Sequence, residues 1–268
     1  MTTTAAPPTR VGELLRGWRQ HRRLSQLDLA NEAEVSTRHL SCVETGRAKP
    51  SRQFVLHVAE HLDVPLRARN ELLVAAGYAP VYGHTDLDAP EMASVREAID
   101  LVLAHAEPFP ALVVDRHWNL VRANGGVGLL LAGVAEHLLE PPVNVLRVSL
   151  HPEGGAPLIE NLEEYSAHVL TNLRREAAAL GDPELLALHD ELAGYPGVVT
   201  GLPVTEPVGV VLPVRMRSPY GLLSFFTTMA RFGTAADVTL AELSIESFFP
   251  ADEATAKAVR ATAAAPTS

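Results

Sequence analysis

Apolar side chains recur every three or four residues through the first eighty positions, which is the spacing of helices with one buried face. The first such stripe consists of Val11, Leu14, Leu15 and Trp18. Four further stripes follow at short intervals, so the pattern predicts five short helices that share one small core. The later four helices are expected over residues 26–33, between Ser36 and Gly46, after Ser51 and over residues 66–77.

Cap residues mark the second and third of these helices. Ser25 and Ser36 each precede an apolar stripe, where a serine oxygen can accept hydrogen bonds from the free N–H groups of the first turn. Gly46 is expected to end the third helix. Only a few residues join the second helix to the third, which favours a helix-turn-helix that presents its second helix to the major groove of DNA.

The outward polar side chains of the third helix are therefore candidate contacts to base edges. Arg38 can bind guanine through two hydrogen bonds, Thr37 can meet a thymine methyl group, and His39 can hydrogen-bond a base or a phosphate. The predicted base-reading residues are Thr37, Arg38, His39, Ser41 and Cys42. The predicted phosphate contacts are Gln26, Ser36, Arg47, Lys49 and Arg52.

Beyond the helices, residues 79–91 contain glycine and proline without apolar periodicity, and we interpret them as a linker. The rest of the chain alternates between helical and strand patterns. A helix is expected around residues 95–103, and "ALVVDRHWNLVRAN" predicts two strands around a polar turn. Helices are expected again after Asn124, over residues 158–180 and after Asp182, and strands within residues 208–216, 221–233 and 238–249. These elements predict an α+β domain with a five-stranded antiparallel sheet and helices packed on one side of it.

The charge is divided between the two parts of the chain. Residues 1–80 contain eleven Lys and Arg against eight Asp and Glu, whereas residues 81–268 contain eleven against twenty-four. From Arg10 to Arg52 the excess is four positive charges, which could meet DNA phosphates. The two parts are therefore expected to have different partners.

The sequence argues against several classes of function. The single cysteine, Cys42, excludes an internal disulfide and a Cys-rich zinc site, so metal chemistry would have to rest on His and carboxylates, and we predict no metal site. No apolar leader or stretch long enough to span a bilayer occurs, so we expect a cytoplasmic protein that does not bind membranes. Adjacent acidic pairs point to different sides of a helix, and no catalytic or phosphate-binding motif occurs, so we expect neither an enzyme nor a cofactor.

The stretch "LSQLDLANEAEVSTRHLSCVETGRAKPS" resembles the Xre, or phage-repressor-like, helix-turn-helix family, over about residues 10–78. The resemblance implies an all-α domain of five helices. It also implies that Glu44, in the Glu-x-Gly that ends the third helix, pairs with Arg19 of the first helix. These two residues would then be structural rather than DNA-reading. A module that docks a protein instead of DNA is the alternative.

Three stretches of the second part resemble the MmyB-like ligand-binding domain of actinobacterial regulators: "VVDRHWNLVRAN", "HVLTNLRREAAALGDPELLALHDEL" and "RFGTAADVTLAELSIESFFPADEATAKAVRA". The resemblance covers residues 92–262 and implies a PAS-like fold whose pocket takes fatty-acyl or other apolar ligands. The expected organisation is multidomain, with residues 1–9 and 263–268 as disordered ends around the two domains.

Candidate pocket residues are the large apolar side chains of the strands, together with two basic ones. Arg122 is expected on the face of Trp118 and Leu120, where it could meet a ligand carboxylate, and His168 on the long helix is a second candidate. The full set is Phe109, Trp118, Leu120, Arg122, Tyr165, His168, Met216, Phe225, Phe226, Met229 and Phe232. A sheet covered by helices needs the same apolar residues for its core, so both interpretations stay open.

Together these features predict a transcriptional regulator that binds a palindromic operator as a homodimeric repressor and senses an apolar small molecule such as a fatty acid. Two alternatives remain. In one, a protein partner docks on the C-terminal domain in place of a small ligand. In the other, an enzyme that binds a ligand is fused to the DNA-binding module.

Overall fold

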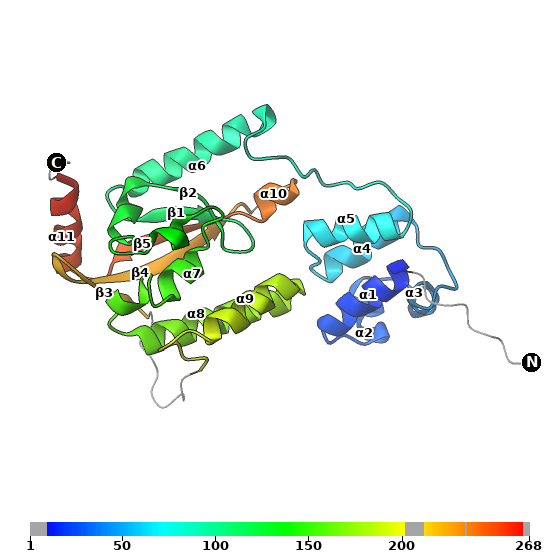
Figure 1. The fold of residues 1–268 in the computed structure, drawn as a ribbon. Helices are drawn as coiled ribbons and strands as arrows, with labels where there is room; N and C mark the ends of the chain where they lie inside the picture. Colours follow the sequence, from blue (N-terminus) through cyan, green and yellow to red (C-terminus); the bar gives the residue numbers. More distant parts are fainter. Residues whose placement is uncertain (1–9, 202–211, 234, 265–268) are drawn as a thin grey trace, which may run out of the picture. The chain divides into compact units, whose positions relative to one another are not determined.

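A computed structural model describes residues 10–201, 212–233 and 235–264 of the chain (Figure 1). The chain forms two compact units. The N-terminal unit contains residues up to Thr85 with two short later segments, Ala179–Gly181 and Ala235–Ala241. The C-terminal unit contains the remaining described residues.

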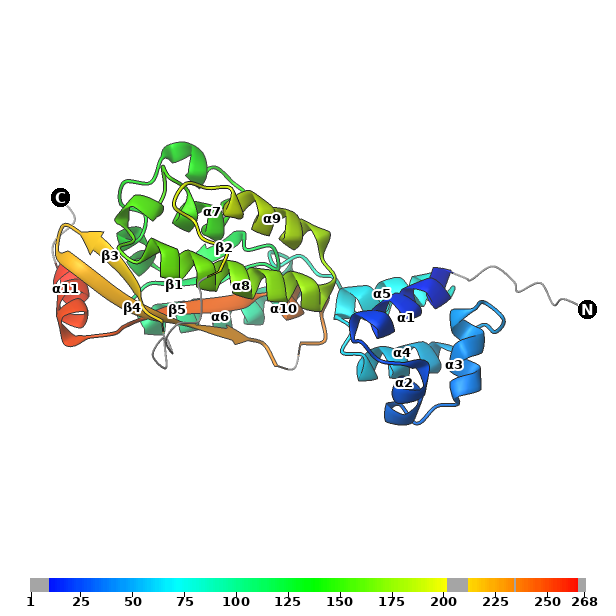
Figure 2. The same cartoon turned by 90° about the horizontal axis from the view of Figure 1, so that it is seen from below.

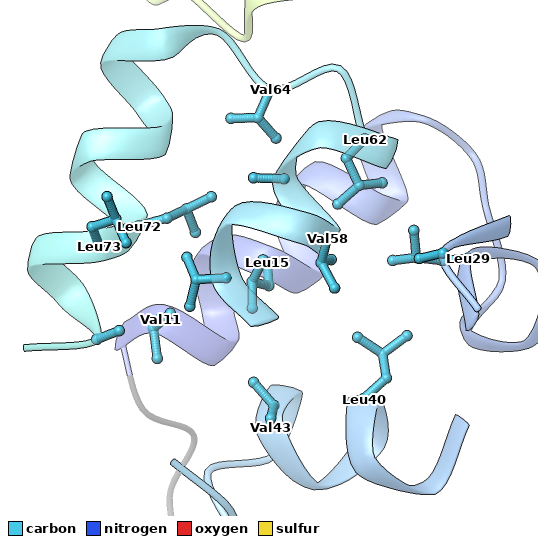
Figure 3. Close-up of a cluster of buried hydrophobic side chains, with 14 of the residues drawn as sticks. Val11, Leu15, Leu29, Leu40, Val43, Val58, Leu62, Val64, Leu72 and Leu73 are labelled. Atoms are coloured by element: carbon cyan, nitrogen blue, oxygen red, sulfur yellow. The ribbon is translucent and has the colours of Figure 1, made fainter. Parts of the chain in front are cut away.

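The N-terminal unit is the predicted set of five helices. They are α1 (Arg10–His21), α2 (Gln26–Glu32), α3 (Thr37–Glu44), α4 (Arg52–His61) and α5 (Leu66–Ala75), and the short α10 (Val238–Ala241) groups with them. Side chains from all five helices meet in one core, and Figure 3 shows Leu15, Leu40 and Val58 converging there. The apolar stripes of the sequence are thus the buried faces of the helices, which confirms the predicted helical domain.

The C-terminal unit is built on a five-stranded sheet, as predicted. Its strands are β1 (Ala111–Val114), β2 (Leu120–Ala123), β3 (Val214–Ser218), β4 (Gly221–Arg231) and β5 (Ser244–Pro250). Every neighbouring pair is antiparallel, in the order β2-β1-β5-β4-β3. The central strand β5 therefore joins the early hairpin β1–β2 to the late hairpin β3–β4.

Helices surround this sheet. The α-helices of the unit are α6 (Ala93–Ala106), α7 (Val145–Leu150), α8 (Leu162–Leu180), α9 (Pro183–Ala193) and α11 (Glu253–Ala264). Short 3-10 turns are η1 (Pro90–Met92), η2 (Gly125–Leu129), η3 (Glu136–Leu139) and η4 (Ala156–Leu158). Figure 2 shows α11 beside the β3–β4 end of the sheet.

Helices cover both faces of the sheet, so the prediction that they pack on one side was wrong. Val113 of β1 packs with Ile99 of α6, whereas Leu112 and Val114 pack with Phe225 and other residues of a second cluster. Figure 1 shows α6 on one side of the sheet and α7 to α9 on the other. Strand β1 is accordingly buried at every position, a pattern that the sequence shows as the unbroken apolar run "ALVV".

Three predicted elements differ from the structure. The segment after Asn124 forms the 3-10 turns η2 and η3 instead of an α-helix, and residues 238–241 are helix α10 instead of the start of a strand. Helix α11 extends to Ala264, so residues 263 and 264 are helical and not part of a disordered tail. The predicted disordered residues 1–9 and 265–268, and the strand prediction at residues 208–211, lie outside the described residues.

Candidate DNA-binding surface and ligand cavity

Helix α3 is held by caps at its start and by buried side chains along one face. Its N-cap Ser36 accepts a hydrogen bond from the N–H of His39 at 3.4 Å. Leu40 and Val43 are fully buried in the core. Glu34, between α2 and α3, has a left-handed backbone with φ of 51°, which turns the chain from one helix to the other. On the other faces of α3, Arg38 and His39 are exposed.

The ion pair between Arg19 and Glu44 is present, as the family resemblance implied. The Arg19 Nε donates to Glu44 Oε1 at 2.7 Å and the second guanidinium nitrogen to Oε2 at 2.8 Å, while both residues are buried. Burial would raise the pKa of Glu44, but hydrogen bonds from Arg19 and Gln26 hold it below its usual value. A two-bond contact of this kind fixes the end of α3 against α1.

Gln26 also belongs to this network. Its side-chain amide donates to Glu44 Oε2 at 2.7 Å. The contact to a DNA phosphate stays a prediction, but one donor of the Gln26 amide is engaged inside the unit. Arg16 adds a more distant charge, with its Nε 3.7 Å from Glu44 Oε2. Neither of these contacts to Glu44 was foreseen, because nothing local in the sequence connects Gln26 or Arg16 to Glu44.

The predicted base-reading residues occupy the uncovered side of α3. Arg38 is exposed, with no side-chain hydrogen bond or ion pair to the described residues. His39 is exposed too, but its ring packs edge-on against Phe54, with 4.8 Å between ring centroids. Thr37, Ser41 and Cys42 are half-buried. Of the five residues, Arg38 therefore has the greatest freedom to reach a base.

The predicted phosphate contacts after α3 form an exposed basic group. Arg47, Lys49 and Arg52 are all exposed. Arg47 donates through Nε to the Thr45 hydroxyl at 3.0 Å, and the Lys49 ammonium lies 5.5 Å from the centroid of the Tyr78 ring. These contacts orient two of the three cations. Exposed cations that follow the second helix of a helix-turn-helix are suited to contacts with DNA phosphates.

A cavity of about 740 Å³ opens in the C-terminal unit. It lies between η2, the β3–β4 hairpin and α11, and a volume of this size suits a small organic ligand. Its lining residues are mostly apolar. They are Glu107, Pro108, Gly125, Gly126, Gly128, Leu129, Leu130, Ala132, Leu158, Met216, Arg217, Ser218, Pro219, Tyr220, Leu223, Phe225, Val259, Thr262 and Ala263.

Two of the eleven predicted pocket residues line this cavity, namely Met216 and Phe225. Four others belong to the core cluster on the same side of the sheet without lining the cavity. They are Phe109, Trp118, Leu120 and Tyr165. These four residues therefore belong to the core of the sheet and not to the cavity wall.

Arg122 lies on the other face of the sheet, so the prediction that it shares a face with Leu120 was wrong. The register of β1 and β2 shifts between Val113 and Val114, because β2 contains a bulge. Arg122 consequently pairs across from Val113 and binds Asp100 of α6 at 3.0 Å. A shift of one residue reverses the face of a side chain, and here it moves the guanidinium away from the cavity.

The last four pocket predictions also lie off the cavity. His168 is exposed on α8 and bonds Asn172. Phe226 stacks on Phe249, with 5.4 Å between ring centroids, and Phe232 packs against the α6 side of the sheet. Met229 is 43% exposed. The large apolar residues of β4, and Phe232 just after it, are therefore divided between the two faces of the sheet and the exposed end of the strand.

Sequence reasoning missed most of the cavity wall. One part of the wall comes from the segment 125–132, which includes the glycines Gly125, Gly126 and Gly128. A Cβ atom at Gly126 would lie 2.6 Å from the carbonyl oxygen of Pro108. The glycine therefore permits close contact between two backbone segments. That requirement is the signal in the sequence that could have pointed to this wall.

An acidic residue, Glu246, lies half-buried in the central strand β5, outside the cavity lining. It is paired across from Leu112 and Met229, and burial raises its pKa to about 7, although a hydrogen bond with Thr227 works in the opposite direction. Burial also raises the pKa of the Tyr165 hydroxyl, with the neighbouring Glu246 as a second cause.

Among the described residues, no helix is long and apolar enough to cross a membrane. No curated protein matches the chain. Residues 10–72 match the family model of a helix-turn-helix domain, and residues 95–261 match that of the MmyB-like transcription regulator ligand binding domain. Both models describe regulatory domains, and together they make the chain a DNA-binding transcription regulator. Since the second match spans more than half of the sequence, the chain belongs to the family of the MmyB-like transcription regulator ligand binding domain.

Proposed function

We propose that the protein is an Xre-type repressor that binds a palindromic operator as a homodimer. The observation that carries the DNA-binding half is the exposed, unpaired Arg38 on a helix that Glu44 and Arg19 fix in place. In this proposal Arg38 contacts a base edge, and the exposed cations Arg47 and Lys49 contact phosphates.

Two substitutions separate these roles. Arg38→Ala is expected to relax preference at one base position and to cost about 1–3 kcal/mol for the preferred operator. Lys49→Ala is expected to weaken binding to every sequence and to flatten its dependence on salt. Binding of wild type and both variants to a randomised duplex library, selected at several salt concentrations, measures both effects. Identical behaviour of the two variants would contradict the assignment of base and phosphate contacts.

We further propose that the cavity takes an apolar or amphipathic small molecule such as a fatty acid. Support comes from its volume and from the apolar side chains of Leu129, Leu130 and Phe225 in its wall. The exposed Arg217 and Tyr220 lie at its edge, where the polar end of an amphipathic ligand could stay in water. Arg122, bound to Asp100 on the other face of the sheet, has no part in this site.

The ligand would act by changing how two helix-turn-helix modules are spaced along DNA. Half-sites read by such a dimer are about 34 Å apart, one turn of the double helix. A ligand that binds one arrangement of the dimer more tightly than another makes that arrangement more populated. The resulting change in operator affinity is limited by the ligand's difference in affinity for the two arrangements. Native mass spectrometry of the operator complex, with and without ligand, tests both the dimer and the shift.

A matched pair of variants tests the cavity. Leu130→Trp fills the wall of the cavity, whereas Leu186→Trp adds the same bulk at a position on α9 that is 46% exposed and outside the lining. We expect a fluorescent long-chain fatty acid to bind wild type and Leu186→Trp but not Leu130→Trp. If none of the three proteins binds it, and organic extraction of the purified protein releases no apolar compound, the alternative of a protein partner on the C-terminal unit gains support.

A further inference from the structure

Two histidines and a glutamate come together at a place that neither the DNA-binding surface nor the cavity includes. His137 belongs to η3, and His151 and Glu153 belong to the turn after α7. One potential ligand atom from each residue lies within 4.8 Å of the other two. The Nε2 of His137 is 3.9 Å from Glu153 Oε2.

The backbone holds these three residues in place. The N–H of Ala135, next to η3, donates to the carbonyl oxygen of Glu153 at 2.9 Å. The turn itself is packed tightly on α7, because a Cβ atom at Gly154 would lie 2.2 Å from the carbonyl oxygen of Val148. A site whose ligands are positioned by backbone contacts needs little rearrangement to bind an ion.

One face of His151 is also fixed. The Tyr195 ring packs edge-on against it, with 5.1 Å between ring centroids, and the Tyr195 hydroxyl donates to Glu191 at 2.7 Å. The rings of His137 and His151 are likewise edge-on, with their centroids 5.8 Å apart. His137 and Glu153 are exposed and His151 is half-buried, so an ion can reach the site from solvent.

We propose that His137, His151 and Glu153 bind a divalent transition-metal ion of the zinc type. Two imidazoles and a carboxylate are a ligand set that Zn²⁺ accepts, with water in the fourth position. Ligand atoms of a tetrahedral zinc ion are roughly 3.4 Å apart for bonds of about 2.1 Å, so the side chains have to move only slightly. Hard ions such as Mg²⁺ prefer oxygen ligands and should not compete.

A hydrogen bond to the ring of His151 competes with metal binding. The N–H of Glu153 donates to Nδ1 of His151 at 3.1 Å. In the neutral ring this leaves the proton on Nε2. An ion must either displace the Glu153 N–H from Nδ1, or bind Nε2 after the proton has moved to Nδ1, and both routes end this hydrogen bond. The bound ion would then connect η3 to the turn after α7.

The test is zinc binding to the full-length protein after treatment with a chelator. Zn²⁺ is titrated in competition with a chromophoric chelator, and binding to wild type is compared with binding to His137→Ala and Glu153→Gln. The matched controls are His105→Ala, an exposed histidine on α6, and Glu136→Gln, an exposed glutamate adjacent to His137. Circular dichroism establishes that each variant is folded.

We expect wild type and both controls to bind one zinc ion per chain that the two site variants do not bind, even in excess Mg²⁺. Zinc should also raise the melting temperature of wild type and the controls, and leave that of the site variants unchanged. Equal zinc binding by wild type and the two folded site variants would overturn the proposal. So would loss of the ion from the controls, or its displacement by Mg²⁺.

Discussion

Replacing Glu246 by glutamine should stabilise the C-terminal unit above neutral pH and have little effect in acid. The carboxyl lies in the central strand of the sheet, and burial raises its pKa from 4.5 to about 7. The described residues make no ion pair with it. Glutamine has nearly the same shape and cannot ionise, so the substitution removes the titration and keeps most of the packing.

The sign of the stability change depends on whether the folded or the unfolded chain binds the Glu246 proton more tightly. Between pH 4.5 and about 7 the unfolded chain releases the Glu246 proton while the folded unit retains it. The stability contributed by the neutral carboxyl is therefore complete below pH 4.5 and is lost as pH rises through about 7. A difference of about 2.5 pKa units corresponds to about 3 kcal/mol of unfolding free energy.

The measurement is urea unfolding at a series of pH values from 4 to 9, followed by circular dichroism. It gives the difference in unfolding free energy between Glu246→Gln and wild type. Other titrating groups contribute equally to both proteins and cancel. The variant should be more stable by about 3 kcal/mol above pH 8 and equal to wild type near pH 4. Parallel curves over the whole range would refute the argument that burial keeps this carboxyl neutral.

Three further predictions concern single contacts. Glu44→Ala leaves the buried Arg19 without its carboxylate partner and with only the Leu24 carbonyl oxygen as acceptor. It should lower the unfolding free energy of the N-terminal unit by about 3–5 kcal/mol, measured by denaturant unfolding, with sequence preference on DNA retained. Gly126→Ala forces a Cβ against backbone and should lower the melting temperature, whereas the control Gly128→Ala, whose Cβ meets nothing within 4 Å, should not. Asp182→Ala removes the N-cap of α9 together with the contacts of Asp182 to His117 and Arg116, and should cost about 1–2 kcal/mol in urea unfolding near pH 7. Because hydrogen bonds outweigh burial and lower the pKa of Asp182, the cost should shrink as pH falls through its titration.

The N-terminal unit could be predicted from sequence because its determinants are local. The caps Ser25 and Ser36 act on N–H groups within three residues, and the apolar stripes repeat within each helix. The ion pair of Arg19 and Glu44 joins residues 25 positions apart and came from the resemblance alone. The bond from Gln26 to the same carboxylate had no such signal, so a residue expected on the DNA surface has a second, internal role.

In the C-terminal unit, the register of the first hairpin and the wall of the cavity could not be predicted from local sequence patterns. The sequence pattern located β1 and β2, but it did not indicate the register shift between Val113 and Val114. Nor did it indicate that Trp118, in the turn before β2, adopts a left-handed backbone with φ of 65°, a conformation uncommon for such a residue. With this register Arg122 lies opposite Val113 and contacts Asp100 of α6. The cavity wall, in turn, combines a glycine segment, a hairpin and the last helix, which lie far apart in the sequence. Alternation within one strand cannot report contacts between such distant segments. Phe225 of β4 was correctly predicted to line the cavity, whereas the close approach of two backbone segments at Gly126 was not predicted.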